Sequence, residues 1–187
     1  MRIIAGEFRS RTLEAPAGMA TRPTSDRLRE TLFNVLGARV EGARFLDLYA
    51  GSGAVGLEAL SRGAREVVFV ERAPAAVKAM RANLARLGVS EGFRVVVAGV
   101  GAFLKKPVAE SGLDVVFLDP PWDAANEYDV ALGLLSGAAA GVLAEGAVVV
   151  AEHRRKVKLA DGYGMLKRVR LLEQGDAGLS FYEGQRS

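Results

Sequence analysis

Short apolar runs alternate with amphipathic segments along most of this chain. The runs FLDLY, EVVFVE, FRVVVA, DVVFL and AVVVAEH have the length and the β-branched content of buried strands. Between them, segments such as 54–63 and 74–88 carry apolar residues at helical spacing, and each ends in glycine. Strands that alternate with helices predict an α/β fold, in which a mostly parallel sheet is covered on both faces.

The two ends of the chain follow other patterns. Residues 1–14 alternate loosely and predict a short hairpin, while residues 24–36 predict a helix that begins with a capping hydroxyl. The segments 164–172 and 178–183 predict a closing antiparallel strand pair. We therefore expect a Rossmann-like, seven-stranded, mostly parallel sheet with an antiparallel C-terminal strand pair, plus a small N-terminal hairpin and helix extension.

The surplus positive charge is concentrated near the N-terminus. The net charge is +3 and the pI is about 9.4. Residues 1–40 hold seven Arg against four acids, a net of +3, whereas the rest of the chain balances 18 basic against 18 acidic residues. We therefore divide the chain into an N-terminal basic arm and helix, 1–40, and a main domain, 41–187.

Composition excludes several kinds of chemistry. The 187 residues, 50% of them hydrophobic, can bury one sizeable core. The absence of cysteine excludes disulfides, thiolate nucleophiles and the cysteine-dependent methylation of a pyrimidine carbon, and a single histidine gives little support for a metal site, so we expect none. No apolar run reaches the roughly 20 residues of a membrane span, and the N-terminus lacks the apolar core of a signal peptide, so we expect a cytoplasmic protein.

A glycine-rich loop follows the first predicted strand. Gly51 and Gly53 allow a turn too tight for side chains, and Gly56 lets the following helix pack closely on the strand. Such a loop at a helix N-terminus binds a nucleotide-like cofactor. Asp47, at the strand end, can accept a hydrogen bond from a cationic or amino-bearing ligand, and Glu71 lies at the second strand's tip, where an acid reaches ribose hydroxyls.

The fourth predicted strand ends in Asp119-Pro120-Pro121-Trp122. Two prolines fix φ and remove two N–H donors, so the loop presents bare acceptors, the Asp119 carboxylate and the Pro120 carbonyl. These acceptors could hold both N–H groups of a planar amino group, and Trp122 offers a flat face for stacking a heteroaromatic ring. Because the carboxyl ends of parallel strands share one edge of a sheet, we expect this loop to lie beside the glycine loop.

The two loops together resemble a known family. DLYAGSG at 47–53 and DPPW at 119–122 are similar to the cofactor and catalytic motifs of S-adenosylmethionine-dependent amino-methyltransferases of the class I, Rossmann-like fold. The segments MRIIAGEFRSRTL and TRPTSDRLRETLFN, at 21–34, resemble the bacterial 16S (small-subunit) rRNA guanine-N2 methyltransferases. The resemblance runs over nearly the whole chain, and it implies a cytoplasmic enzyme of ribosome biogenesis.

The resemblance also implies roles for individual residues. The cofactor-binding residues for S-adenosyl-L-methionine would be Asp47, Ala50, Gly51, Ser52, Gly53, Glu71, Arg72 and Val100. Asp47 and the glycine turn would hold the methionine part, and Glu71 the ribose hydroxyls. Many relatives place an acid after the third strand for the adenine amino group, but Gly99 stands there in this chain. Backbone atoms near Val100 would then read the adenine.

The implied catalytic residues are Asp119, Pro120, Pro121 and Trp122. The guanine amino nitrogen is conjugated with its ring and is a poor nucleophile, whereas a sulfonium methyl is a good electrophile. The task of the enzyme is therefore largely alignment of the nitrogen with the methyl group, with a late proton loss to Asp119. The base must leave its stack to reach such a pocket, so we expect a flipped or loop nucleotide stacked on Trp122.

Arginines at the N-terminus and a second basic run after the fifth strand are the candidates for contacts with the RNA backbone. They are Arg2, Arg9, Arg11, Arg22, Arg27, Arg29, Arg154, Arg155, Lys156 and Lys158. The expected partner is 16S rRNA, either free or in a small-subunit assembly intermediate with ribosomal proteins, and the enzyme is expected to act as a monomer. Glu152 and His153 border the same edge, and we assign no chemistry to them.

Three other functions are compatible with parts of the sequence. Amino-methyltransferases acting on DNA adenine or on a protein glutamine use the same Asp-Pro-Pro-aromatic arrangement, and only the N-terminal arginines argue against them. An oxidoreductase would explain the glycine loop but leaves the residues 119–122 without a role. A non-catalytic RNA-binding assembly factor would retain the fold but would have no need for both motifs.

Overall fold

A computed structural model of the protein describes residues 1–16, 24–106, 111–121, 124 and 126–184. Its strands are β1 (Arg44–Leu48), β2 (Glu66–Glu71), β3 (Phe93–Val97), β4 (Leu113–Leu118), β5 (Leu143–Arg154), β6 (Gly162–Tyr163), β7 (Leu166–Gln174) and β8 (Ala177–Gly184). Its α-helices are α1 (Asp26–Leu36), α2 (Ala54–Ser61), α3 (Pro74–Leu87), α4 (Val100–Lys105) and α5 (Asn126–Leu135).

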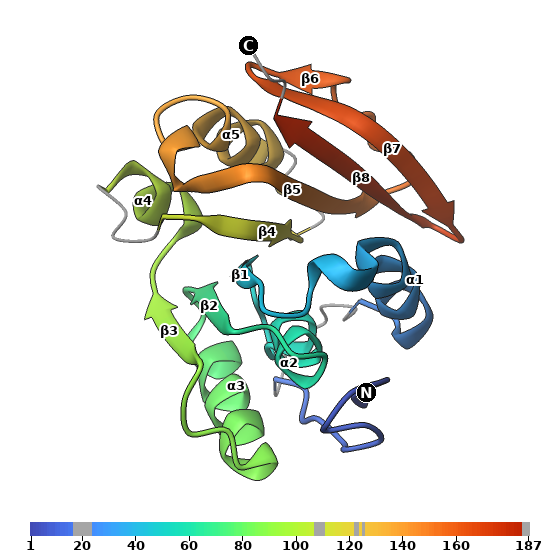
Figure 1. Cartoon of the computed structure of the whole chain (residues 1–187), viewed down its shortest axis with the longest axis vertical. Helices are drawn as coiled ribbons and strands as arrows, with labels where there is room; N and C mark the ends of the chain where they lie inside the picture. The colour runs from blue at the N-terminus through green and yellow to red at the C-terminus, as the bar shows by residue number, and fades with distance from the viewer. Residues whose placement is uncertain (17–23, 107–110, 122–123, 125, 185–187) are drawn as a thin grey trace.

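All of these strands form one sheet in the order β3-β2-β1-β4-β5-β8-β7-β6 (Figure 1). The first five in this order pair in parallel, and the last three are antiparallel. The predicted α/β fold with an antiparallel C-terminal pair is therefore confirmed. The order reverses between β1 and β4, which creates the crevice at the carboxyl ends of the strands where ligands bind in such sheets.

The predicted number of strands was one too low. The additional strand, β6, consists only of Gly162 and Tyr163, which pair with Lys167 and Leu166 of β7. Gly164 turns the chain between them with a φ of +51°. A two-residue strand is shorter than one period of hydrophobic alternation, so its pattern in the sequence cannot be distinguished from a loop.

Helices cover both faces of the sheet, and alternate residues along each strand belong to different cores. Phe45, Phe117 and Val150 pack with α1, α2, α3 and the N-terminal arm, while Leu118 and Val149 pack with α4 and α5. Strands buried on both faces have few polar positions, which explains why the apolar runs in the sequence are nearly continuous. One consequence is that polar residues at the strand ends can be assigned to a face by counting in steps of two.

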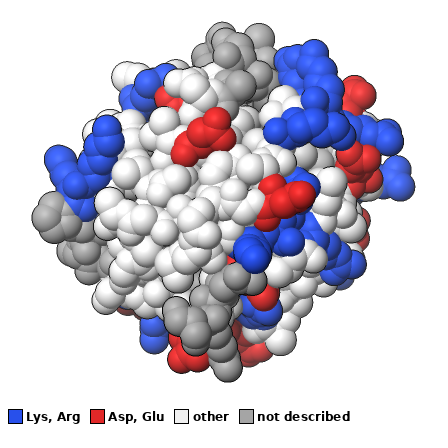
Figure 2. Space-filling model, turned by 90° about the horizontal axis from the view of Figure 1, so that it is seen from above, with Lys and Arg blue, Asp and Glu red and all other residues white. Residues whose placement is uncertain are grey.

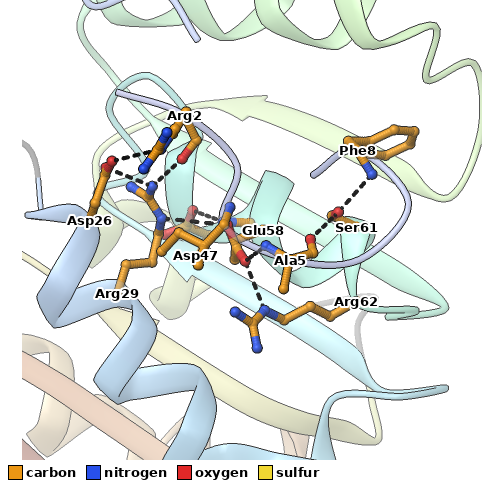
Figure 3. Close-up of polar contacts among 11 residues, drawn as sticks. Arg2, Ala5, Phe8, Asp26, Arg29, Asp47, Glu58, Ser61 and Arg62 are labelled. Carbon is orange, nitrogen blue, oxygen red and sulfur yellow. Dashed lines mark hydrogen bonds and ion pairs between the residues drawn. The ribbon is translucent and has the colours of Figure 1, made fainter. Parts of the chain in front are cut away.

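The predicted N-terminal hairpin is a short arm, residues 1–14, with a single antiparallel bridge between Arg2 and Thr12. It lies on the C-terminal part of α2 (Figures 1 and 3). The backbone N–H groups of Ile4 and Ala5 donate to the Glu58 carboxylate at 2.8 and 3.0 Å. The arm also contributes Ile3 and Leu13 to the core it shares with α1 and α2, and its contacts are those of an integral part of the fold.

Among the described residues, no helix is long and apolar enough to cross a membrane.

Candidate active site

The glycine-rich loop connects β1 to α2 as the sequence predicts. Gly51 and Gly53 have φ values of +56° and +79°, and α2 begins at the residue after Gly53. A Cβ atom on Gly53 would lie 2.9 Å from Met80 Cγ, so glycine is required there by packing as well as by conformation. Ala50 and Ser52 are buried in the same turn. The first turn of α2 therefore points its N–H groups toward the carboxyl edge of the sheet.

Asp47 lies on β1 beneath this loop and is 2% exposed. Its Oδ2 accepts a hydrogen bond from the Gly56 N–H at 2.9 Å. Burial raises the pKa of Asp47 to about 7, against a lowering by the Gly56 bond and a smaller raising by the charge of Glu71. The ionised form of Asp47 is therefore disfavoured in the fold, and a cationic ligand nearby would stabilise it.

Glu71 lies at the tip of β2, where the sequence predicts it. Its Oε2 accepts the Gly51 N–H at 2.9 Å, and its Oε1 accepts the N–H groups of Arg72 and Ala73 at 2.7 Å. This carboxylate therefore joins the glycine loop to the start of α3. The side chain of Arg72 is exposed beside it.

Gly99 and Val100 follow β3 at the same edge. Gly99 is the N-cap of α4, and a Cβ atom on it would meet no heavy atom within 4 Å. The position therefore borders open space, although it offers no side chain to a ligand. The side chain of Val100 is buried in the other core, so its backbone N–H, in the first turn of α4, is the group that could face a ligand.

Asp119 follows β4, and its N–H donates to the Leu48 carbonyl of β1 at 3.4 Å. The residue as a whole is partly exposed, but its Oδ1 atom is inaccessible and has no hydrogen-bond partner among the described residues. A buried acceptor without a donor is uncommon in folded proteins and marks a place for a ligand group. Pro120 is buried next to it and Pro121 is exposed. The predicted stacking residue, Trp122, lies outside the described residues.

Three carboxylates stand in a row on one face of the sheet. In the register of the parallel strands, Leu48 pairs with Leu118 and Leu118 with Ala151. Counting by two from the core residues of each strand puts Asp47, Asp119 and Glu152 on the face that carries α1 and α2. Burial, then the charge of Glu152, then that of Asp47 raise the pKa of Asp119 well above its usual range.

Glu152 is the member of this row that has no role in the sequence motifs. It is 3% exposed, and its Oε2 accepts a hydrogen bond from Thr24 Oγ1 at 2.6 Å. Its backbone carbonyl accepts from the Tyr128 hydroxyl of α5 at 3.0 Å. The signal that could have revealed it was its position in the apolar run AVVVAEH, one residue past the register partner of Leu118. His153 is buried against Ser180, with its Nε2 2.9 Å from the Ser180 hydroxyl.

Tyr49 is a second residue at this edge that sequence reasoning did not identify. It has a φ of +61°, an uncommon conformation outside glycine. Its hydroxyl donates to Glu127 Oε2 of α5 at 2.6 Å. This hydrogen bond links Tyr49, which lies just before the glycine loop, to α5, the helix that follows the Asp-Pro-Pro segment.

Arg29 was expected to face solvent or RNA, and that expectation was wrong. Its side chain is 0% exposed, and Nε lies 3.6 Å from Glu58 Oε2 (Figure 3). Its Nη2 donates to Asp26 Oδ1 at 3.0 Å and to the Arg2 carbonyl. Arg29 therefore joins α1, α2 and the arm. On α1 the capping hydroxyl is that of Ser25, which accepts the Leu28 N–H at 3.2 Å.

The other N-terminal arginines among the described residues are exposed: Arg2, Arg9, Arg11 and Arg27. Arg22 lies outside the described residues. Arg27 precedes Thr31 by one helical turn, and Thr31 Oγ1 lies 3.3 Å from Gln174 Oε1 at the end of β7. The exposed start of α1 therefore lies next to the turn that joins β7 and β8.

The second basic run borders the same turn from the other side. Arg155 and Lys156 are exposed and Arg154 is half-buried. The Arg155 N–H donates to the Asp176 carbonyl in the β7–β8 turn, and its Nε pairs with Glu173 at 3.0 Å. Figure 2 shows Lys and Arg on both sides of the molecule, with more of them, interspersed with Asp and Glu, on the right, the side on which β7 lies in Figure 1. The two predicted basic segments thus approach each other around the β7–β8 turn.

Within the described part of the chain, no group of three or more His, Asp or Glu side chains has an arrangement that could hold a metal ion. The row of three carboxylates is therefore not arranged as a metal site.

Known proteins resemble most or nearly all of this chain. The family described as Conserved hypothetical protein 95 matches residues 1–183. YlbH of Bacillus subtilis (strain 168), a candidate rRNA methyltransferase, is 36% identical over 184 residues, which cover 98% of each protein. The ribosomal RNA small subunit methyltransferase D of Haemophilus influenzae is 43% identical over 136 residues, 72% of this chain and 70% of that protein.

Solved structures agree with these relatives. The structure of yhhF from Escherichia coli, a candidate methyltransferase, is 33% identical and superposes with a TM-score of 0.84, covering 99% of this chain and 98% of its own. The resemblance that the motifs predict is thereby confirmed, as is the Rossmann-like methyltransferase fold. The chain belongs to the Conserved hypothetical protein 95 family, together with the ribosomal RNA small subunit methyltransferase D proteins.

Proposed function

We propose that this protein transfers a methyl group from S-adenosyl-L-methionine to the exocyclic N2 amino group of a guanine in 16S rRNA during ribosome biogenesis. The observation that carries the proposal is the buried Oδ1 of Asp119, which has no donor among the described residues. It lies beside Pro120, a residue without an N–H, at the edge that also holds the glycine loop. A group with two N–H donors fits this pair of acceptors.

The residues at the other half of the edge fit the proposed cofactor. A sulfonium and an amino group are positively charged, and Asp47 is a buried carboxylate whose pKa is raised by its surroundings. Glu71 offers acceptors for a ribose diol, and the space beside Gly99 is open for an adenine ring. When bound, the cofactor supplies an electrophilic methyl group. Asp47, Glu71 and the backbone of the loop would hold it in place.

Asp119 then has two tasks. It aligns the target nitrogen by accepting one of its N–H groups, while the Pro120 carbonyl accepts the other. As the nitrogen gains positive charge, an ionised Asp119 becomes the natural acceptor of its proton. The raised pKa of Asp119 means that it holds a proton more firmly than an ordinary aspartate, which suits a group that has to receive one.

The proposed substrate is 16S rRNA, free or in a small-subunit assembly intermediate with ribosomal proteins. The names of the relatives support an rRNA substrate. The exposed Arg27, Arg155 and Lys156, from the two basic segments that approach the β7–β8 turn, are candidates for contacts with its backbone. We also propose that the protein acts in the cytoplasm and as a monomer, since the arm and both motifs come from one chain.

Transfer of labelled methyl groups tests this proposal. The full-length protein is incubated with labelled S-adenosyl-L-methionine and unmodified small-subunit rRNA, either naked or as ribonucleoprotein, and the RNA is digested to nucleosides. Label in N2-methylguanosine is the expected result. Label in another nucleoside, or in DNA or protein instead of RNA, would replace the proposed target, and no label in any acceptor would favour a non-catalytic assembly factor.

A further inference from the structure

We propose that Glu152 is a specificity residue, which accepts the N1–H of the target guanine while Asp119 and Pro120 hold its N2 amino group. This inference rests on the proposed function and extends it, because it names the group that distinguishes guanine from other amino-bearing bases. The residue concerned was not part of either sequence motif, and it enters through its position beside Asp119.

The position follows from the sheet. Leu118 pairs with Ala151 in the parallel register of β4 and β5, so the next residues, Asp119 just past the end of β4 and Glu152 within β5, follow at the same level. Both stand on the face covered by α1 and α2. After burial, the charge of Glu152 is the largest influence that raises the pKa of Asp119. The Oδ1 atom of Asp119 is inaccessible and has no hydrogen-bond partner among the described residues.

Among the described residues, one contact positions the carboxylate of Glu152 and two position its backbone in the absence of RNA. Thr24 Oγ1 donates to its Oε2 at 2.6 Å. The Tyr128 hydroxyl donates to its carbonyl at 3.0 Å, and its backbone pairs with Leu179 of β8. A carboxylate has about four lone-pair sites, so its acceptance of the Thr24 hydroxyl is compatible with further donors. A carboxylate oriented by its neighbours in this way is suited to reading a hydrogen-bond pattern.

The chemistry of the bases makes the pattern selective. Guanine presents two adjacent donors on its Watson–Crick edge, the N1–H and the N2 amino group, and a row of acceptors matches both. Adenine and 2-aminopurine present an amino group beside an N1 that is itself an acceptor. A carboxylate at that place would face a lone pair, and a site built to hydrogen-bond a donor rejects an analogue that lacks it.

The experiment compares two substrates with two proteins. The guanine that the wild-type protein methylates is replaced by 2-aminopurine, which keeps the N2 amino group but has no N1–H. We expect the wild type to prefer guanine by about 100-fold in kcat/KM, the loss that corresponds to one hydrogen bond to a charged group. Glu152→Gln keeps the size of the side chain and an oxygen for Thr24, but adds an N–H. We expect it to narrow the preference by at least about 10-fold, and its affinity for S-adenosyl-L-methionine should stay the same.

The outcomes separate this inference from the proposed function. A wild type that methylates guanine and 2-aminopurine within about 3-fold of each other overturns the role of Glu152, even if the Glu152→Gln protein does not fold. A Glu152→Gln protein that loses activity on both substrates in equal proportion would indicate a purely structural residue and overturn it as well. A wild type that methylates no RNA contradicts the proposed function itself.

Discussion

Asp119 combines an unsatisfied acceptor with a charge that its surroundings disfavour. Replacing it with alanine removes the group that would align and deprotonate the target nitrogen, so we expect Asp119→Ala to lower kcat by at least about 100-fold. The affinity for S-adenosyl-L-methionine, measured by calorimetry, should change less than about 3-fold, because the cofactor residues lie on β1 and β2. Glu91→Gln, which changes an exposed acid between α3 and β3, serves as the control. An active Asp119→Ala protein would end the alignment mechanism.

Asp47 makes a prediction about stability and pH. Its pKa in the folded protein is about 7, against 3.8 for an unperturbed group. Between these values the unfolded chain has lost the proton that the folded protein retains, so the free energy of unfolding falls as the pH rises from about 4 to 7. The loss is at most about 4 kcal/mol, at 1.36 kcal/mol per unit of pKa.

Asp47→Asn removes this titration and keeps an oxygen for the Gly56 N–H. We therefore expect the variant to gain stability relative to the wild type as the pH rises from 4 to 7, with no further gain above about 8. Urea denaturation of the two proteins at pH 4.5 and pH 8 measures the difference. If the two proteins differ by the same free energy of unfolding at both pH values, folding does not raise the pKa of Asp47.

At the scale of helices and loops, the sequence predicted those features that depend on neighbouring residues. The turn at Gly51–Gly53 and the rigid Asp119–Pro121 loop could be anticipated because their chemistry lies within a few consecutive residues. The inward direction of Arg29 could not, because the carboxylate that pairs with it, Glu58, lies far away in the chain. The hydrogen bond from Thr24 to Glu152 could not be predicted for the same reason, because Glu152 lies 128 residues later in the chain.

The packing of α2 on the sheet gives an element-scale prediction. A Cβ atom on Gly56 would lie 2.2 Å from Phe69 Cε1 and 2.8 Å from Val67 Cγ1, so Gly56→Ala should destabilise the protein by about 1–3 kcal/mol. Gly133 lies inside α5, where an added Cβ atom would meet no heavy atom within 4 Å, so Gly133→Ala should stabilise by about 0.5–1 kcal/mol. Thermal melting compares the two. If Gly56→Ala leaves the melting temperature unchanged or raises it, the close approach of α2 to β2 is not what requires glycine.

Helix α1 offers a pair of arginines with opposite surroundings. Arg29→Met removes one partner of a buried ion pair and should cost about 3–5 kcal/mol. Arg27→Met, two positions earlier and exposed, should change the stability by less than about 0.5 kcal/mol. Its effect should appear in RNA affinity instead. Both variants are tested by chemical denaturation and by RNA binding. If the two substitutions had the same effect in either assay, the assignment of Arg29 to stability and of Arg27 to RNA binding would be wrong.

For the molecule as a whole, the proposed RNA surface lies around the β7–β8 turn. Changing Arg27 and Lys156 to glutamine should weaken RNA binding and reduce the slope of log K against log salt by about 1.4–1.8, because each lost phosphate contact contributes about 0.7–0.9. The control is the same exchange at Lys78 and Arg81, two exposed residues of α3. Filter binding at several salt concentrations gives both slopes. Equal reductions of the slope for the two pairs would show that RNA binding depends on the total charge of the protein and not on the residues around the β7–β8 turn.

The attachment of the arm to α2 and α3 has a consequence for how the chain is made. Ile4 donates to a residue 54 positions later, and Glu14 to Asn83, 69 positions later. At a synthesis rate of about 5–20 residues per second, the arm waits roughly 3–14 s on the ribosome before its partners exist. During that time Ile3 and Leu13 have no core to enter. Residues 1–14 are thus synthesised before α2 and α3, but they can reach their native positions only after those helices exist.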